Sequence, residues 1–339
     1  MAEPARNAPQ AAPGWQVWTA LLIVFFVWGS TYIAIRVVVE TMPPLLAGGI
    51  RFVIAGAIVA VALVARGGVQ RLRVSRRELA NSALIGLLLL LVGNGLVSVG
   101  EKTVASGLAA LVVGTIPLFV LLIRWVSRER VAPAALVGVC IGFVGLAVLM
   151  VPGGLDGSVD VAGMVFLTIA SLSWSIGSYL SGRIALPRDP FVSTAYQLLS
   201  GGVLLLLVAI PTGDWRVDPA VFSMESLLSL AYLVTAGSLL AYTAYTWLLQ
   251  HAPITRVATY AYVNPVVAVT LGWIILNERI TLTAAIGAVL IIASVAFTIW
   301  TDSTARTRAA NAVAEESRAA AGPRHASEPR PAPGPAGEG

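Results

Sequence analysis

The sequence predicts an all-α integral membrane protein with ten transmembrane helices, arranged as two inverted repeats of five helices each. Three observations predict this fold class. The composition is too apolar for a protein in water, ten apolar segments are separated by turn residues, and several landmarks recur in the same order in both halves of the chain.

The composition excludes an ordinary water-soluble domain. Of the 339 residues, 57% are hydrophobic and 12% are charged, and the mean hydropathy is +0.84. Soluble domains are roughly half apolar and a quarter charged, so this chain lacks the polar surface that a soluble fold of its length needs. Because a spanning helix takes about 20 apolar residues, the chain has room for about ten spans and little else.

Few residues are available for metal, cofactor or covalent chemistry. Cys140 is the one cysteine, which excludes an intramolecular disulfide and a thiolate metal cage. The two histidines, His251 and His325, lie outside the predicted spans, so we expect neither a metal site nor an activated nucleophile inside the membrane. The sequence also lacks a GxxxxGK phosphate loop. We expect no enzyme, no ATP-driven motor and no cofactor.

Apolar windows of about 19 residues define the helices. Turn signals such as Met42-Pro43-Pro44 and Arg66-Gly67-Gly68 separate them. The predicted helices cover residues 16–39, 45–65, 79–99, 103–125, 131–150, 161–183, 191–210, 226–249, 254–276 and 281–300. The predicted domains are a cytoplasmic N-terminal segment (1–15), a first repeat (16–150), a second repeat (151–300) and a disordered cytoplasmic tail (301–339).

The basic residues predict the orientation in the membrane. Arginines gather in alternate short loops, namely Arg66, Arg71, Arg73, Arg76, Arg77, Arg128, Arg130, Arg183 and Arg188. The opposite loops hold only Lys102, Arg216 and Arg279. Because short cytoplasmic loops carry the excess of Lys and Arg, both termini are predicted to face the cytoplasm, with the protein in the cell membrane. The net charge of +5 is therefore interpreted as a topology signal, and no nucleic acid partner is expected.

The two halves share landmarks at nearly constant separation. The pairs are Trp28 and Trp174, Pro44 and Pro190, Ile116-Pro117 and Asn264-Pro265, Trp125 and Trp273, and Glu129-Arg130 and Glu278-Arg279, at offsets of 146 to 149 residues. Each half holds five spans, an odd number, so the second repeat must enter the bilayer inverted. Inverted repeats serve alternating access, in which two halves open a central cavity first to one side and then to the other.

Several motifs stand in the order and spacing of a known family. They are Trp28-Gly29-Ser30, Gly49-Ile50-Arg51-Phe52, the run from Val92-Gly93-Asn94-Gly95 through Glu101 to Ile116-Pro117-Leu118, and the two stretches from proline to Glu-Arg. With these motifs, residues 16–300 resemble the drug/metabolite transporter superfamily, specifically its EamA-type ten-span exporters. The resemblance implies a secondary carrier, commonly an exporter of amino acids or other small metabolites, with a cavity lined by both halves. Gln197 stands in the place of Arg51 in the second half, so charge-based recognition would be asymmetric.

Polar and aromatic residues at bilayer depth are the candidates for the cavity lining. Such groups are costly in lipid and usually face a water-filled path or a partner. Arg51 is the strongest candidate, either for neutralising a substrate carboxylate or for pairing with Glu101 or Glu40. The aromatic members suit stacking on a flat or amphipathic solute, although packing between helices would also explain them. The candidates are Trp28, Tyr32, Arg51, Asn94, Ser98, Trp174, Ser178, Tyr242, Tyr245, Tyr260 and Asn264.

Glu101, at the end of the third predicted helix, is the candidate for ion coupling. Asn94, Ser98 and Glu101 are spaced at i, i+4 and i+7 and share one helix face. If protons drive export, a desolvated Glu101 with a raised pKa would carry them, and a solvated loop residue is the alternative interpretation. Pro117 and Pro265 interrupt two spans at similar depth and are the candidate hinges, either for rocking of the halves or as fixed kinks.

These features predict a secondary transporter that exports small metabolites by alternating access. The favoured substrates are amino acids or related hydrophobic or aromatic solutes or drugs. A phosphorylated-metabolite exchanger is the alternative, although it would need several cations converging at mid-depth, and a channel or scaffold protein ranks below it. The expected partners are a small-molecule substrate and the lipid bilayer, with proton coupling and a homo-oligomer left open.

Overall fold

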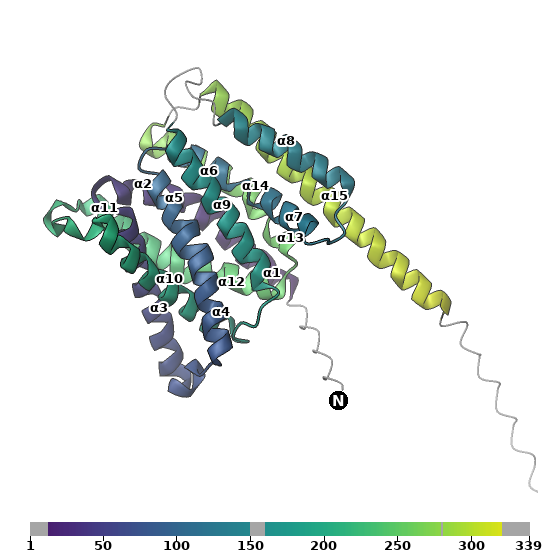
Figure 1. Ribbon diagram of the computed structural model, residues 1–339, viewed down its shortest axis with the longest axis horizontal. Helices are drawn as coiled ribbons and strands as arrows, with labels where there is room; N and C mark the ends of the chain where they lie inside the picture. The colour runs from purple at the N-terminus through teal and green to yellow at the C-terminus, as the bar shows by residue number, and fades with distance from the viewer. Residues whose placement is uncertain (1–12, 150–159, 279–280, 321–339) are drawn as a thin grey trace, which may run out of the picture.

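The computed structural model describes residues 13–149, 160–278 and 281–320, and within these ranges the regular structure is entirely helical (Figure 1). The all-α fold is therefore confirmed for the described part of the chain. Eight helical segments are long and apolar enough to cross a membrane, and two shorter apolar helices, Pro133–Val148 and Val263–Leu276, complete the ten predicted spans.

Several spans consist of two or three helices in line. In chain order the spans are α1 (Gly14–Ile23), η1 (Val24–Trp28) and α2 (Gly29–Thr41); α3 (Pro44–Gly67); α4 (Arg76–Gly86), η3 (Leu87–Asn94) and α5 (Gly95–Gly100); α6 (Ser106–Val113) and α7 (Ile116–Val126); α8 (Pro133–Leu149); α9 (Val161–Ser181); α10 (Pro190–Thr212); α11 (Met224–Tyr232), η6 (Leu233–Tyr242) and α12 (Thr243–His251); α13 (Ile254–Val257) and α14 (Tyr260–Leu276); and α15 (Leu282–Ala320). Short 3-10 helices lie in the connections, namely η2 (Val69–Leu72), η4 (Asp214–Arg216) and η5 (Pro219–Val221).

Side-chain caps fix where several spans begin. α4 starts with a capping box, in which the Ser75 hydroxyl accepts a hydrogen bond from the Glu78 amide and the Glu78 carboxylate accepts one from the Ser75 amide. Asp160 and Asp189 accept hydrogen bonds from the first amides of α9 and α10. Ser223 caps α11 in the same way. These polar residues satisfy amides that have no partner inside a helix.

Three spans contain a π-helical segment, and each segment ends at a residue that faces the interior of the bundle. η1 ends at Trp28, η3 at Asn94 and η6 at Tyr242. A π-helical turn holds an extra residue, so it rotates the side chains that follow, and it is frequent at functional sites. A regular helical period does not predict such turns.

α3 and α10 occupy corresponding positions in the two halves and pack along each other. Glycines bring their backbones close together. A Cβ atom on Gly202 would lie 2.7 Å from the backbone nitrogen of Val53, and one on Gly56 would lie 2.9 Å from that of Leu199. Backbone atoms cannot rotate away from a new methyl group, so the helices would have to separate.

Gly202→Ala is expected to lower the free energy of unfolding by about 1–3 kcal/mol, the usual cost of overpacking. The measurement is the melting temperature of the detergent-purified protein. Gly182→Ala is the matched control, because nothing lies within 4 Å of a Cβ atom at that position. Equal shifts for the two variants would contradict the close approach of α3 and α10.

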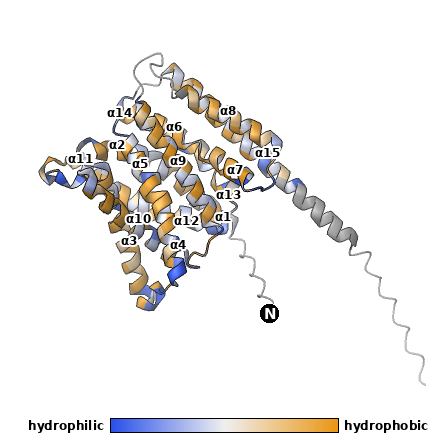
Figure 2. Ribbon diagram, viewed as in Figure 1, coloured by the Kyte–Doolittle hydropathy of each residue, from blue (hydrophilic) through white to orange (hydrophobic). Residues whose placement is uncertain are grey.

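The outer surface of the bundle is apolar. Large apolar side chains such as Ile54, Val61, Leu207 and Val289 are exposed. Figure 2 shows hydrophobic residues along the helices and hydrophilic residues in the connection between α3 and α4. A surface of this kind is matched to lipid and not to water. The chain is a multi-pass integral membrane protein.

α8 and α15 pack along each other at one edge of the bundle (Figure 1). α15 continues to Ala320, where the sequence analysis expects a disordered tail from residue 301. Asp302 is buried and forms an ion pair with Arg124 of α7, with 2.7 Å between Nη1 and Oδ2. This long-range partner cannot be read from composition. Residues 1–12 and 321–339, which hold most of the predicted terminal segments, lie outside the described residues.

Candidate functional site

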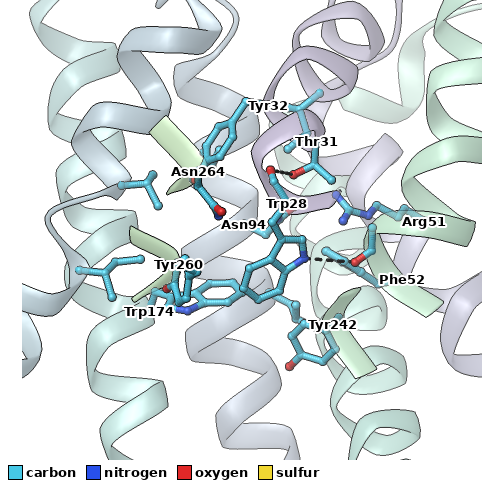
Figure 3. A pocket seen from close by; sticks show the side chains of 16 residues that line it. Trp28, Thr31, Tyr32, Arg51, Phe52, Asn94, Trp174, Tyr242, Tyr260 and Asn264 are labelled. Carbon is cyan, nitrogen blue, oxygen red and sulfur yellow. Dashed lines mark hydrogen bonds between the residues drawn. The ribbon is translucent and has the colours of Figure 1, made fainter. Parts of the chain in front are cut away.

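A cavity of about 560 Å³ lies between helices of both halves (Figure 3). Its lining comes from the first, second, third, fourth, sixth, eighth and ninth spans. The lining residues are Trp28, Thr31, Tyr32, Ile35, Arg51, Phe52, Leu90, Asn94, Val97, Val113, Ile116, Trp174, Gly237, Tyr242, Tyr260 and Asn264. The last residues of all three π-helical segments are among them, so these irregular turns shape the cavity wall.

A second cavity of about 250 Å³ continues the first toward one side of the membrane. The two cavities share Ile35, Arg51 and Asn94. From there the second cavity runs toward the connection between α2 and α3, where Val39 and Pro44 line it. The central cavity is therefore extended toward the side on which α2 ends and α3 begins.

An aromatic cluster borders the opposite end of the central cavity. Its members are Trp28, Trp174, Tyr245 and Tyr260, with the Trp28 ring centroid 5.4 Å from Trp174, 4.8 Å from Tyr245 and 5.6 Å from Tyr260. Trp174 Nε1 donates a hydrogen bond to the Tyr245 hydroxyl over 3.1 Å, and that hydroxyl also lies 2.6 Å from Ser178 Oγ. These contacts pack the first, sixth, eighth and ninth spans together at this end of the cavity.

Arg51 brings a positive charge to the cavity wall. Its side chain is only 4% exposed, and Nε donates a hydrogen bond to Ser238 Oγ over 2.8 Å. The guanidinium lies over the Phe52 ring, 4.7 Å from the centroid. Gly237 leaves room for it, because a Cβ atom there would lie 2.8 Å from Arg51 Nη2.

Arg51 forms no ion pair with any carboxylate in the part of the chain that the structure describes. The pairing with Glu101 or Glu40, one of the two interpretations of the sequence, is therefore not observed. A buried charge without a counter-ion is costly. The free edge of the guanidinium faces the cavity, where an anionic ligand would relieve that cost.

Gln197, the repeat counterpart of Arg51, is neutral and bonded within the protein. It accepts a hydrogen bond from the Tyr242 hydroxyl over 2.7 Å and donates one to Ser193 Oγ over 2.8 Å. The cavity is therefore asymmetric in charge, with the cation contributed by the first half alone among the described residues.

Comparison with known proteins decides the family. A family model described as the EamA-like transporter family matches the chain twice, over residues 15–151 and 161–300. The chain belongs to the EamA-like transporter family. The double match also agrees with the two repeats predicted from the landmarks.

Two relatives of this EamA-like transporter are named as transporters. The chain is 40% identical over 254 residues to the uncharacterized inner membrane transporter YedA of Escherichia coli, covering 75% of this chain and 80% of that protein. It is 27% identical over 288 residues to the uncharacterized transporter YoaV of Bacillus subtilis, covering 81% and 94%. A solved crystal structure matches with a TM-score of 0.60 at 22% identity, covering 85% of this chain and 97% of that one, which supports the fold alone.

Within this EamA-like transporter, most of the predicted cavity residues lie together. Trp28, Tyr32, Arg51, Asn94, Trp174, Tyr242, Tyr260 and Asn264 line the central cavity. Ser98 lines the second cavity. Ser178 and Tyr245 line neither and stand behind Trp174, where they hold its ring. Thr31, Phe52 and Gly237 are lining residues that the sequence analysis missed, although the first two lie beside Tyr32 and Arg51 in the sequence.

The candidate hinges differ in position. Pro265 lies inside α14, whereas Pro117 lies in the first turn of α7, after the helical break at Gly114 and Thr115. Neither lines the central cavity, and Pro117 lines a separate cavity beside Arg124. The two prolines therefore do not occupy equivalent places in their spans.

Glu101 lies outside the lining of both cavities. It follows the last residue of α5 and is fully buried, at 0% exposure. Neither of its carboxylate oxygens has a hydrogen-bond partner in the described structure. Burial excludes the interpretation as a solvated loop residue for this conformation.

Proposed function

We propose that this EamA-like transporter exports small solutes that carry one carboxylate and an apolar or aromatic part, with amino acids and related metabolites as the favoured class. The observation that carries the proposal is Arg51, a buried cation that lines the cavity and has no acidic partner among the described residues. A planar guanidinium matches a carboxylate in geometry and can bind it through two parallel hydrogen bonds.

The rest of the lining suits the remainder of such a solute. Leu90, Val97 and Val113 provide apolar wall, and Trp28 and Trp174 offer ring faces at one end. Aromatic rings bind flat or apolar groups by stacking, and amide side chains such as Asn94 can bind an amino group. A cavity with one charged group and few polar groups fixes orientation without demanding one particular side chain.

The same geometry supports alternating access. The cavity extends toward the α2–α3 connection, and packed aromatic rings border its other end, which favours access to Arg51 from the first side. By the arginine-rich loops, that side is the cell exterior and both termini are cytoplasmic. Location in the cell membrane is supported by the relative YedA, which is named as an inner membrane transporter. The inverted repeats then provide the opposite state by exchanging the shapes of the two halves.

A phosphorylated metabolite fits less well. Its two or more negative charges call for several cations, and Arg51 is the single charged side chain among the described residues that line the two cavities. A channel is disfavoured because the aromatic rings of Trp28, Trp174, Tyr245 and Tyr260 pack against one another at one end of the cavity. Neither class accounts for a lone buried guanidinium.

Counterflow in sealed vesicles tests the proposed substrate class. Vesicles loaded with unlabelled phenylalanine are expected to take up labelled phenylalanine in a saturable way, because exchange requires only binding and reorientation. Labelled phenylethylamine, which has the ring and the amine but no carboxylate, is the matched control and is expected to show no counterflow. Exchange of glucose 6-phosphate would favour the phosphorylated class, and non-saturable flux would favour a channel.

A further inference from the structure

An acidic cluster lies at the end of the bundle toward which the cavity extends. Glu101, between α5 and α6, is fully buried and neither carboxylate oxygen has a hydrogen-bond partner in the described structure. Glu278 comes from the other half of the chain, and its carboxylate accepts hydrogen bonds from the backbone amides of Ser106, over 2.7 Å, and Gly107, over 3.1 Å. Ser106 Oγ is buried and also lacks a partner.

The charged and titratable groups around Glu101 are few. Glu278 and Arg36 are the charged groups that act on its carboxyl, and Tyr32 of α2 lies near enough for its hydroxyl to be affected by that carboxyl. Arg36 Nη1 donates hydrogen bonds to the backbone carbonyl oxygens of Glu101 and Lys102. At the start of α9, Asp160 accepts a hydrogen bond from the Thr103 hydroxyl, and Lys102 is exposed. Arg279 lies outside the described residues.

The opposite side of the membrane contains the repeat counterpart of this cluster. The fourth and ninth spans both end in a left-handed residue, Arg128 with φ 59° and Asn277 with φ 54°. A glutamate follows each of them, Glu129 and Glu278. The amide of Glu129 donates to the carbonyl of Arg124 over 2.9 Å, and the amide of Glu278 donates to that of Gly272 over 3.1 Å. The backbone geometry therefore makes Arg124 and Gly272 counterparts.

A glycine in the place of Arg124 means that the Glu278 side lacks the positive charge that Arg124 provides on the Glu129 side. On the side of Glu129, Arg124 pairs with Glu129 at 2.9 Å and with Asp302 at 2.7 Å, and Arg183 pairs with Glu129 as well. At least two arginines thus face these two acids in the described structure. Burial opposes ionisation of Glu129, but hydrogen bonds from Arg124 and Tyr179 and the charge of Arg183 lower its pKa below the usual range.

On the side of Glu278, the counterpart of Arg124 is a glycine. A Cβ atom on Gly272 would lie 2.4 Å from Glu278 Oε2, so the carboxylate occupies the space into which a side chain would extend. Among the described residues, Glu101 and Glu278 therefore face one arginine, Arg36. Leu249 stands 148 residues after Glu101, so the other side has no equivalent of this second acid.

We propose that the buried Glu101 carboxyl, which has no hydrogen-bond partner in the described structure, holds one exchangeable proton. This proton enters from the side to which the cavity opens and drives export in the opposite direction. The proposal rests on the proposed function, since it names the ion to which that transport is coupled. The step is a protonation, in which the carboxylate of Glu101 gains a proton from water and becomes a neutral carboxyl. Tyr32 lines the cavity, and its hydroxyl lies within electrostatic reach of the Glu101 carboxyl.

The pKa of the Glu101 carboxyl is shifted in the direction that a proton site there requires. Burial raises the pKa of the Glu101 carboxyl well above its usual range, the negative charge of Glu278 raises it further, and Arg36 opposes the rise. At pH values between the ordinary pKa of the carboxyl in the unfolded chain and its raised pKa in the folded protein, the folded state binds more protons than the unfolded state. Stability therefore falls as the pH rises through that window, and it is highest below the ordinary pKa of a carboxyl group.

The melting temperature as a function of pH tests the proton site without any substrate. For the full-length protein in detergent, the melting temperature is expected to fall as the pH rises from 5 to 8, and Glu101→Gln is expected to flatten this dependence. Glu40→Gln is the matched control, since Glu40 is an exposed carboxylate at the same end of the bundle, and it should keep the wild-type dependence. An unchanged dependence in Glu101→Gln would overturn the proposal.

Should Glu101→Gln fail to fold, Glu278→Gln gives a second test. Removing the neighbouring negative charge is expected to move the fall in melting temperature to lower pH, because the Glu101 carboxyl then ionises more readily. No displacement of the pH profile would contradict a proton site formed by the two acids.

Transport in vesicles tests the coupling. With labelled phenylalanine as the probe, Glu101→Gln is expected to keep counterflow and to lose the accumulation driven by a pH gradient, because a permanently neutral side chain can reorient but cannot carry a proton. Accumulation driven by a sodium gradient alone would overturn the coupling. If wild-type protein does not transport phenylalanine, the proposed substrate class fails, while the melting profiles still decide the proton site.

Discussion

Arg51→Gln is expected to reduce phenylalanine counterflow by about 30-fold or more while leaving the protein folded. Truncating one partner of a buried, hydrogen-bonded charge pair costs about 2 kcal/mol or more, and about 1.4 kcal/mol corresponds to a factor of ten. The transported carboxylate is the proposed partner in this pair. The measurement is the initial rate of counterflow in vesicles that contain equal amounts of each variant.

Stability should separate a binding role of Arg51 from a structural one. The guanidinium is buried, and among the described residues its one hydrogen bond goes to Ser238, so its removal should not lower the melting temperature. Arg51→Lys keeps the positive charge but loses the planar guanidinium. Its counterflow rate should therefore lie between those of the wild type and Arg51→Gln. Arg71→Gln is the control for an exposed arginine. Wild-type counterflow in Arg51→Gln would contradict the assignment.

Asp302→Asn is expected to be the most destabilising single change among the ion pairs, by about 3 kcal/mol, because it removes the buried partner of Arg124 and leaves the partly exposed Glu129 to face that buried charge. The side chains of Arg124 and Asp302 are each only 2% exposed, and the pair joins α7 to α15. The measurement is unfolding by denaturant or heat in detergent. Transport should be affected less than stability, because neither residue lines the central cavity.

Asp189→Asn is the matched control for this prediction. Asp189 pairs with Arg71 at 2.8 Å, but the two side chains are 32% and 38% exposed. Exposed pairs contribute about 0–1 kcal/mol, so the control should be nearly neutral. Equal losses in the free energy of unfolding for Asp302→Asn and Asp189→Asn would contradict a stabilising role for the burial of the Arg124–Asp302 pair.

The positions of the spans could be predicted because each is an apolar segment that ends at polar, proline or glycine residues. The second predicted span, 45–65, corresponds to Pro44–Gly67, and the seventh, 191–210, to Pro190–Thr212. Helix α15 is the exception, because its continuation past residue 300 is tied to a contact between Asp302 and Arg124 that joins distant parts of the chain. Local sequence contains no sign of such a contact.

The cavity residues were predictable for a related reason. Polar and aromatic side chains at bilayer depth must face an interior, so Arg51, Asn94 and Asn264 were found from depth alone. The partners were not predictable. Helix spacing placed Glu101 on one face with Asn94, but α5 ends at Gly100, and Glu101, the next residue, lies outside the lining of both cavities. Its neighbour Glu278 lies in the other repeat, and only the fold brings the two together.

Accessibility of a single cysteine tests the central claim, that the cavity opens to one side of the membrane at a time. Ile35 lines both cavities, so Ile35→Cys in a Cys140→Ser background places one thiol on the path. A membrane-impermeant maleimide is expected to label it from the exterior, and saturating phenylalanine should change the rates from the two sides in opposite directions. Rapid labelling from both sides in the same state would contradict alternating access and indicate a continuous channel.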